Sequence, residues 1–152
     1  MLILGEGCKN QTKDQLNKIN KTTMEQTTEK LAVEKVLFAY GEALNKSDVN
    51  KVLQVYTHDG VFMPTTLPTA KGAEQLRESY TNVFKAIQLN VKFTFEEIVV
   101  SGDVAFAQTS SNGTTLIHAN GQTVAEENRE FFFLNKENEE WKISRYMFNK
   151  AK

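Results

Sequence analysis

The hydrophobic repeat of the chain changes its period once, near Leu89, and this change constrains the fold more than any other feature. Before Leu89, apolar residues recur at three- and four-residue steps in three segments, as on the buried face of an amphipathic helix. After Leu89 they recur at every second residue, beginning with VKFTF at 91–95, which is typical of a strand with one buried face. The sequence therefore predicts helices followed by an antiparallel sheet, which is an α+β fold.

The three helical segments are separated by start and stop signals. The first should end in NKSD at 45–48, where Ser47 or Asp48 can accept hydrogen bonds from the first-turn amides of the second helix. A short strand, GVFMP at 60–64, and a turn-rich segment at 65–72 precede the third helix. The apolar positions expected to face the core are Val33, Val36, Leu37, Tyr40 and Leu44, then Val49, Val52, Leu53 and Tyr56, then Ala73, Leu76, Tyr80, Val83, Phe84 and Ile87.

Four strands follow, joined by short turns. The alternation of the first strand slips at Glu96–Glu97, which predicts a β-bulge and a bend. The pair Asn120–Gly121 is the strongest hairpin signal in the chain and joins the second strand, at 103–119, to the third, at 124–134. The last strand covers 141–149. We expect a curved antiparallel sheet wrapped as a cone, with an open mouth, around the three N-terminal helices.

The first thirty residues differ in composition from the rest. Residues 5–30 contain no aromatic side chain and are rich in Lys, Asn, Gln and Thr, so they cannot bury enough apolar surface to offset their ordering entropy. We predict a flexible N-terminal arm over residues 1–27, becoming helical near Thr22 or Thr23, and one folded domain over 28–150. The start, MLILGEGC, has too short an apolar run for a lipoprotein signal, although a true start upstream of Met1 would reopen that reading. The expectation is a cytoplasmic protein with a free thiol at Cys8.

Bulk composition excludes several classes of function. A net charge of −1 favours neither a nucleic-acid nor a membrane-surface partner, and no stretch approaches the roughly 20 apolar residues of a membrane span. Two widely separated histidines and one cysteine do not supply a metal site or an internal disulfide. No glycine-rich phosphate loop or nucleophile elbow is present in the sequence. We therefore predict no cofactor and no metal.

Three segments carry a family resemblance: AYGEALNKSDVNKVLQVYTHDGVFMP, KGAEQLRESY and NREFFFLNKENEEWKISRYMFN. In this order they resemble the nuclear transport factor 2-like superfamily, which includes ketosteroid isomerases, scytalone dehydratases and SnoaL-type cyclases. The nearest subgroup is the SnoaL-like one with the bacterial SgcJ/EcaC proteins, and the resemblance covers roughly residues 28–150. It implies a cystatin-like α+β cone, usually homodimeric, with a hydrophobic pocket between the helices and the concave sheet face.

The resemblance to ketosteroid isomerase carries over only in part. Its oxyanion-binding tyrosine corresponds to Tyr40, eight residues before Asp48. Its general base falls on Pro64 or Met63, neither of which accepts a proton, and its second donor falls near Glu130. The resemblance therefore implies retained donors without the base, which argues against isomerase chemistry.

Tyr40 and Glu130 are the candidate catalytic residues, although helical spacing would make Tyr40 a core aromatic in any case. Strand alternation places Glu130 on one face with Glu126, Asn128 and Phe132, and the opposite face carries Glu127, Arg129, Phe131 and Phe133. Arg145 on the neighbouring strand belongs either to the pocket or to a surface ladder. The expected ligand-binding residues are Tyr56, Phe62, Met63, Phe84, Asn128, Arg145 and Phe148, and the apolar ones among them could equally be plain core.

His58 and Asp59 form the other conspicuous pair. We expect them to end the second helix, where a protonated histidine interacts favourably with the helix dipole, and to have a structural role instead of forming a catalytic dyad.

Three functions fit the sequence. The first is a dimeric, cofactor-free protein that binds a small apolar or aromatic molecule, with the homodimer formed through the sheet. The second is an isomerase, cyclase or dehydratase that uses Glu130 as acid or base and Tyr40 as oxyanion donor. The third is a protein-interaction module that uses the convex sheet.

Overall fold

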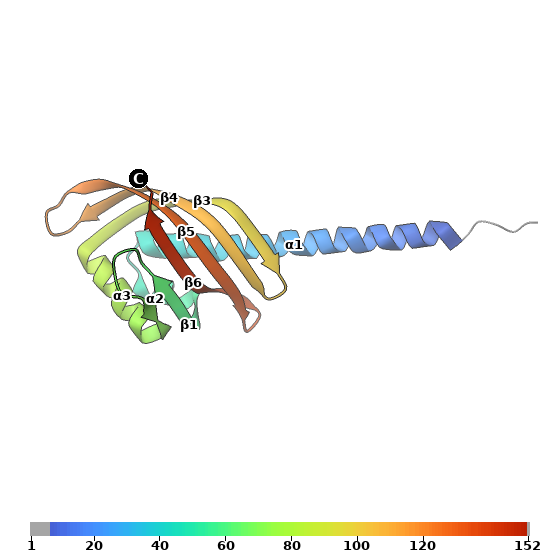
Figure 1. Ribbon diagram of the computed structural model, residues 1–152, viewed down its shortest axis with the longest axis horizontal. Helices are drawn as coiled ribbons and strands as arrows, with labels where there is room; N and C mark the ends of the chain where they lie inside the picture. Colours follow the sequence, from blue (N-terminus) through green and yellow to red (C-terminus); the bar gives the residue numbers. More distant parts are fainter. Residues whose placement is uncertain (1–6, 152) are drawn as a thin grey trace, which may run out of the picture.

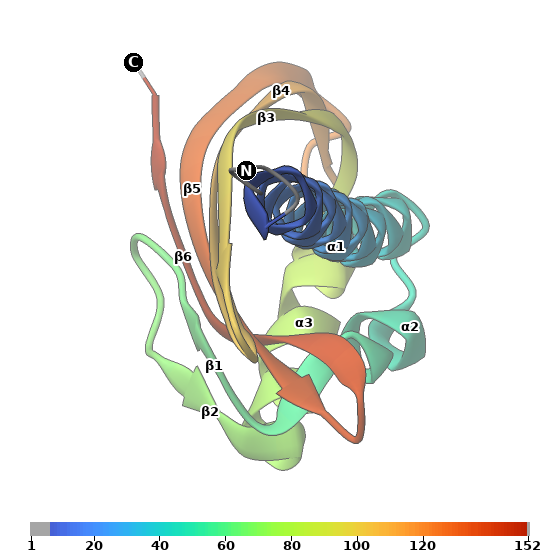
Figure 2. The same cartoon turned by 90° about the vertical axis from the view of Figure 1, so that its right-hand side faces the viewer.

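The computed structural model describes residues 7–151, and the side chains of residues 12–151. Three helices pack against one side of a curled six-stranded sheet, so the predicted α+β fold is confirmed (Figure 1). Viewed along the first helix, the sheet bends around that helix and remains unclosed (Figure 2). The elements are α1 (Gly7–Asn45), α2 (Val49–Gln54), β1 (Tyr56–Met63), β2 (Ala70–Lys71), α3 (Gly72–Ala86), β3 (Ile87–Ser101), β4 (Val104–Ile117), β5 (Thr123–Glu137) and β6 (Glu140–Lys150).

The strand order in the sheet is β2-β1-β6-β5-β4-β3. Strands β3 to β6 form the predicted antiparallel meander, but β1 pairs with β6 in parallel and β2 adds a two-residue edge. The expectation of a wholly antiparallel sheet is therefore corrected. Pairing between β1 and the last strand joins segments far apart in the chain, and a local hydrophobic period carries no information about such pairing.

The second helix ends earlier than expected, at Gln54. The Ile143 amide donates to the Val55 carbonyl oxygen at 2.7 Å, and Tyr56 pairs with Ile143, so the chain enters the sheet at this point. His58 and Asp59 therefore lie within β1 and not at a helix end.

Local signals read from the sequence form as predicted. The Asp48 side chain caps α2 by accepting from the Lys51 amide at 3.0 Å. The register between β3 and β4 shifts between Phe95 and Glu97, which is the expected bulge. At the hairpin turn Gly121 has φ +69°, a left-handed conformation that glycine adopts without steric strain.

Gly113 permits the sharp curl of the sheet in β4. Its φ is +153°, and a Cβ atom there would lie 2.0 Å from the Asn90 carbonyl oxygen of β3. No side chain fits at that distance, so glycine allows the two backbones to approach where the sheet folds over the helices. Gly41 plays the matching part on α1, where a Cβ would lie 2.9 Å from the Phe93 ring.

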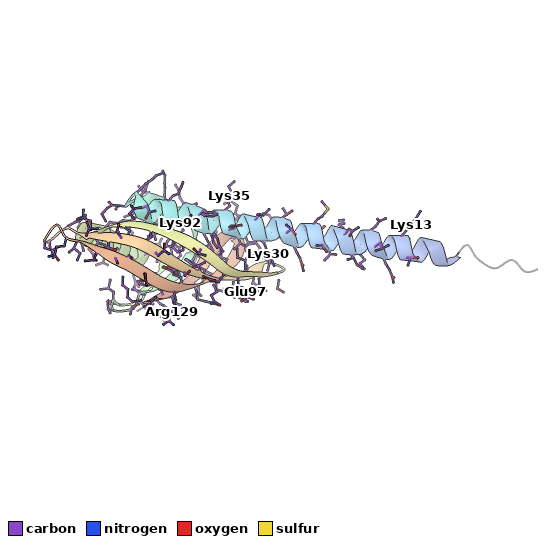
Figure 3. All side chains as sticks on the ribbon, turned by 90° about the horizontal axis from the view of Figure 1, so that it is seen from above. Lys13, Lys30, Lys35, Lys92, Glu97 and Arg129 are labelled. Atoms are coloured by element: carbon purple, nitrogen blue, oxygen red, sulfur yellow. The ribbon has the colours of Figure 1, made fainter. Side chains whose placement is uncertain are left out.

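Helix α1 begins at Gly7, well before the predicted start near Thr22 or Thr23. Its N-terminal half projects beyond the sheet, with Lys13 exposed to solvent (Figures 1 and 3). Backbone hydrogen bonding within a helix does not require a buried face, and low apolar content therefore does not preclude one. The division into an arm over 1–27 and a domain over 28–150 stays a prediction.

The first residue of α1 seen to bond the sheet is Glu29. Its carboxylate accepts from Trp141 Nε1 at 2.6 Å and from Lys136 Nζ at 2.9 Å, which ties the helix to the β5–β6 hairpin. The lipoprotein interpretation rested on residues 1–6 and on the Cys8 side chain. These lie outside the part of the chain that the structure describes. Within the described chain, no helix combines the length and the apolar content needed to span a bilayer.

Candidate functional site

A cavity of about 210 Å³ lies between α1, α3 and the concave face of the sheet. Its aromatic and aliphatic lining comes from α1, α3, β1, β3, β6 and the segment after β1, whereas its carboxyl, amide, hydroxyl and ammonium groups come from β4, β5 and the end of β6. The lining residues are Tyr40, Leu44, Phe62, Pro64, Leu67, Tyr80, Val83, Ile87, Leu89, Val91, Phe93, Ser111, Glu126, Asn128, Glu130, Tyr146, Phe148 and Lys150.

Three tyrosine hydroxyl groups meet beside the cavity. Tyr80 Oη lies 2.7 Å from Tyr40 Oη and 2.7 Å from Tyr56 Oη, so the Tyr80 hydroxyl joins the other two. All three side chains are almost fully buried. Burial raises the pKa of each phenol above its usual value, which keeps the hydroxyls protonated at neutral pH.

Glu130 is the central carboxyl group of the sheet wall and is 3% exposed. Its Oε2 accepts from Thr109 Oγ1 at 2.7 Å, and its Oε1 accepts from Ser111 Oγ. Burial raises the pKa of Glu130 and the nearby Glu126 adds to this, which together outweigh the opposing hydrogen bonds from Ser111 and Thr109.

Glu126 lies four residues before Glu130 on the same face of β5 and has a different environment. Its carboxylate accepts from Thr115 Oγ1 at 2.8 Å, from Asn128 Nδ2 at 3.0 Å and from Lys150 Nζ. Burial alone would raise the pKa of Glu126, but the hydrogen bonds from Lys150, Asn128 and Thr115 bring it below its usual value. Glu126 and Lys150 therefore form a compensated ion pair at the cavity, while Glu130 forms no ion pair with any described Lys, Arg or His.

The structure brings Tyr40, Phe62, Asn128, Glu130 and Phe148, all predicted site residues, to one cavity. The predicted catalytic pair, Tyr40 and Glu130, lies on opposite walls of it. Two further predicted residues stand behind the lining: Tyr56 bonds Tyr80 through its hydroxyl, and the Phe84 ring lies 6.0 Å from the Tyr80 ring.

Met63 and Arg145 do not line the cavity, which corrects their predicted positions. Phe62 pairs with Tyr146, and Met63 pairs with Met147. Because successive side chains alternate between the faces of a strand, Phe62 facing inward turns Met63 outward, and Tyr146 facing inward does the same to Arg145. The outward Arg145 contacts Ser144 and lies 3.7 Å from Asp59.

The sequence reading missed several lining residues. Tyr80 and Tyr146 were hidden by their core-like spacing, and Lys150 by its place at the end of the chain. The alternation along β5 had already placed Glu126 on the same face as Glu130, so Glu126 could have been predicted as a lining residue. Ser111 pairs with Asn128 in the register of β4 with β5, and only the register identifies it.

His58 and Asp59 lie on the surface, outside the cavity. His58 Nδ1 is 2.7 Å from Glu137 Oε2, and Asp59 Oδ1 accepts from Thr57 Oγ1 at 2.9 Å. The hydrogen bond to Glu137 raises the pKa of His58. His58 thus links β1 to the end of β5 and Asp59 links it to Arg145 of β6, and the structural role of the pair stays a prediction. Among the described residues, no cluster of three His, Cys, Asp or Glu side chains could hold a metal ion.

Comparison with known proteins identifies the family. A model of the SnoaL-like domain matches residues 37–143. A ketosteroid isomerase-like protein from Erwinia carotovora atroseptica is 32% identical, with a TM-score of 0.79 over 82% of this chain and 97% of that one. A proposed aromatic ring hydroxylase from Novosphingobium aromaticivorans is 26% identical, with a TM-score of 0.71 over 81% of this chain and 89% of that one.

A more distant structure is that of a proposed dehydratase of the nuclear transport factor 2-like family from Streptomyces avermitilis. It is 14% identical, with a TM-score of 0.72 over 83% of this chain and 98% of that one, and so it shows the fold alone. No curated protein matches the sequence. The family model, which covers more than half of the chain, and the 32% identical structure lead to one conclusion: the chain belongs to the SnoaL-like family.

Proposed function

We propose that this protein binds a small, mainly apolar ring compound in the cavity between α1, α3 and the concave sheet face. The observation that carries the proposal is the composition of the cavity wall: aromatic side chains surround a few convergent polar groups. Small-molecule sites in proteins have this composition, with the polar groups fixing the orientation of the ligand.

The volume limits the size of the ligand. At about 210 Å³ the cavity lies between an engineered cavity of about 150 Å³ that holds benzene and the drug-sized pockets of about 300 Å³ upward. A compound of one or two rings fits this range. Its ring would lie against Phe62 and Phe148, whose rings are stacked 6.1 Å apart, and Tyr40 and Glu130 would orient it from opposite sides.

Ligand-dependent thermal stabilisation tests the proposal. A compound whose free concentration is 100 times its Kd stabilises the fold by about 2.7 kcal/mol. 2-Naphthol is a suitable first probe. Val83→Trp should abolish the shift because Val83 lines the cavity. Lys92→Trp should keep it, because Lys92 is exposed on the convex face of the sheet. Absence of any shift with one- and two-ring compounds, or an equal shift in both variants, would overturn the proposal.

A second candidate, cofactor-independent acid–base catalysis, is favoured by Glu130 alone. It is a buried carboxyl group in a cavity with a raised pKa, which suits a general acid near neutral pH. Tyr40 would then stabilise a developing oxyanion. Full turnover of an identified substrate by Glu130→Gln would exclude this candidate.

We further propose that two copies pair through the convex face of the sheet. Phe131 and Met147 are 41% and 47% exposed there and lie opposite each other in the register of β5 with β6. The Phe106 ring, half-buried, stacks on Phe131 at 5.5 Å and extends this apolar area. Light scattering should show a dimer that Phe131→Lys converts to a monomer. A monomeric native protein would refute the pairing and leave the surface open to a different protein partner.

A further inference from the structure

We propose, on the premise that the cavity binds a small ring compound, that the natural ligand carries a protonated amine and that Glu130 receives it. The proposal rests on the polar wall, which we define as the inward side chains Thr109, Ser111, Thr115, Glu126, Asn128, Glu130 and Lys150. It extends the proposed function from the size of the ligand to its charge.

The hydroxyl and amide donors of the polar wall are already engaged. Thr109 and Ser111 donate to Glu130, and Thr115 donates to Glu126. Asn128 Nδ2 donates to Glu126 Oε1 at 3.0 Å and to Ser111 Oγ at 3.2 Å. These groups therefore keep little capacity to donate a hydrogen bond to a ligand.

The acceptors of the polar wall are in surplus. Asn128 Oδ1 is buried and has no hydrogen-bond partner among the described residues. Exchanging the two ends of this amide would set its oxygen against the Glu126 carboxylate, so the observed orientation is the favourable one. Each carboxylate oxygen can accept more than one hydrogen bond, and Glu130 receives one at each oxygen from the protein. A ligand group that complements Asn128 Oδ1 and the Glu130 carboxylate must itself be a donor.

The charges of the wall distinguish a cationic donor from a neutral one. Lys150 compensates Glu126, and among the described residues no Lys, Arg or His forms an ion pair with Glu130. A buried carboxylate is stable when a cation pairs with it, and the cavity beside Glu130 is the place from which a cation can reach it.

The aromatic side chains beside the polar wall suit the same ligand. The Phe62 ring stacks on Tyr80 at 4.9 Å and on Tyr146 at 5.3 Å, and all three line the cavity. Together these rings form an apolar surface against which the ring of a ligand can pack. A carboxyl group beside several aromatic rings thus provides both the charge and the surface that an arylalkylamine would need.

Three compounds that differ only in the head group test the proposal by calorimetric titration: 2-naphthylmethylamine, 2-naphthalenemethanol and 2-naphthoic acid. We expect the amine to bind about tenfold or more tightly than the alcohol, and the acid to bind most weakly. Glu130→Gln keeps a side chain that can bond Thr109 and Ser111 but lacks the charge, so the preference for the amine should disappear. Glu127→Gln, on the same strand but exposed on the convex face, should leave it intact.

The outcomes separate this inference from the proposed function. If the alcohol or the acid binds as tightly as the amine, the inference is wrong, yet binding of ring compounds stands. If none of the three binds, both fail. Should Glu130→Gln not fold, the ranking of the three compounds on the native protein decides by itself.

Discussion

The hydroxyl group of Tyr80 should contribute more to stability than either hydroxyl group that it contacts. Tyr40 Oη and Tyr56 Oη each lie 2.7 Å from it. Tyr80→Phe keeps the ring and its packing but removes both hydrogen bonds. Tyr40→Phe and Tyr56→Phe each remove one bond and leave Tyr80 with a remaining partner, so they are matched controls.

The magnitude follows from burial. A hydrogen bond contributes about 1 kcal/mol net, and a buried hydroxyl left without a partner costs about 1–3 kcal/mol. Tyr80→Phe removes this partner from two hydroxyls, each on a side chain no more than 4% exposed, so we expect a loss of about 2–4 kcal/mol. The lower value of this range applies if the Tyr40 and Tyr56 hydroxyls shift slightly and bond each other in the variant. Each control should lose about 1 kcal/mol.

Urea denaturation with an unchanged m-value measures these differences, and thermal melting should show a decrease of about 3 °C for each kcal/mol. If Tyr80→Phe is no more destabilising than the two controls, the central position of its hydroxyl has no energetic meaning and the reasoning is refuted.

Further predictions concern the sheet and its attachments. Gly113→Ala should destabilise the fold by about 2 kcal/mol or more, measured by urea denaturation, because its Cβ would meet the Asn90 carbonyl oxygen at 2.0 Å. Glu29→Gln should lower the melting temperature by a few degrees, because the charge that receives Lys136 is lost. The ion pair of His58 with Glu137 should stabilise the fold most below about pH 6.5, the pKa of histidine in the unfolded chain. This stabilisation should be lost as the pH rises through the pKa of His58 in the folded protein, which Glu137 raises.

Controls make these predictions specific. Ser110→Ala, on the same strand as Gly113 but with a Cβ already present, should change stability little. Glu25→Gln on the exposed part of α1 should match the wild-type melting temperature. For the histidine, the difference in melting temperature between wild type and His58→Gln should shrink from pH 6 to pH 9. A difference that is constant or grows over this range would contradict the assigned partner.

Local chemistry was readable from the sequence wherever a few neighbouring residues decide the structure. The Asp48 side chain caps a helix because its oxygen reaches an amide three residues on, and Gly121 turns a hairpin because it accepts positive φ. The alternation along β5 likewise grouped Asn128 with Glu130 before their surroundings were known. These features involve short separations along the chain, and the sequence expresses them directly.

The sequence by itself determined the order of helices and strands, the bulge, the turns and the residues that share a face. Only the tertiary structure decided that β1 lies parallel to β6, which turned Met63 and Arg145 outward and Phe62 inward. It also brought Tyr80 and Tyr40, from different helices, into hydrogen-bond contact. The physical reason is that strand pairing and register are set by contacts between distant segments, and a shift of one residue exchanges the two faces of a strand.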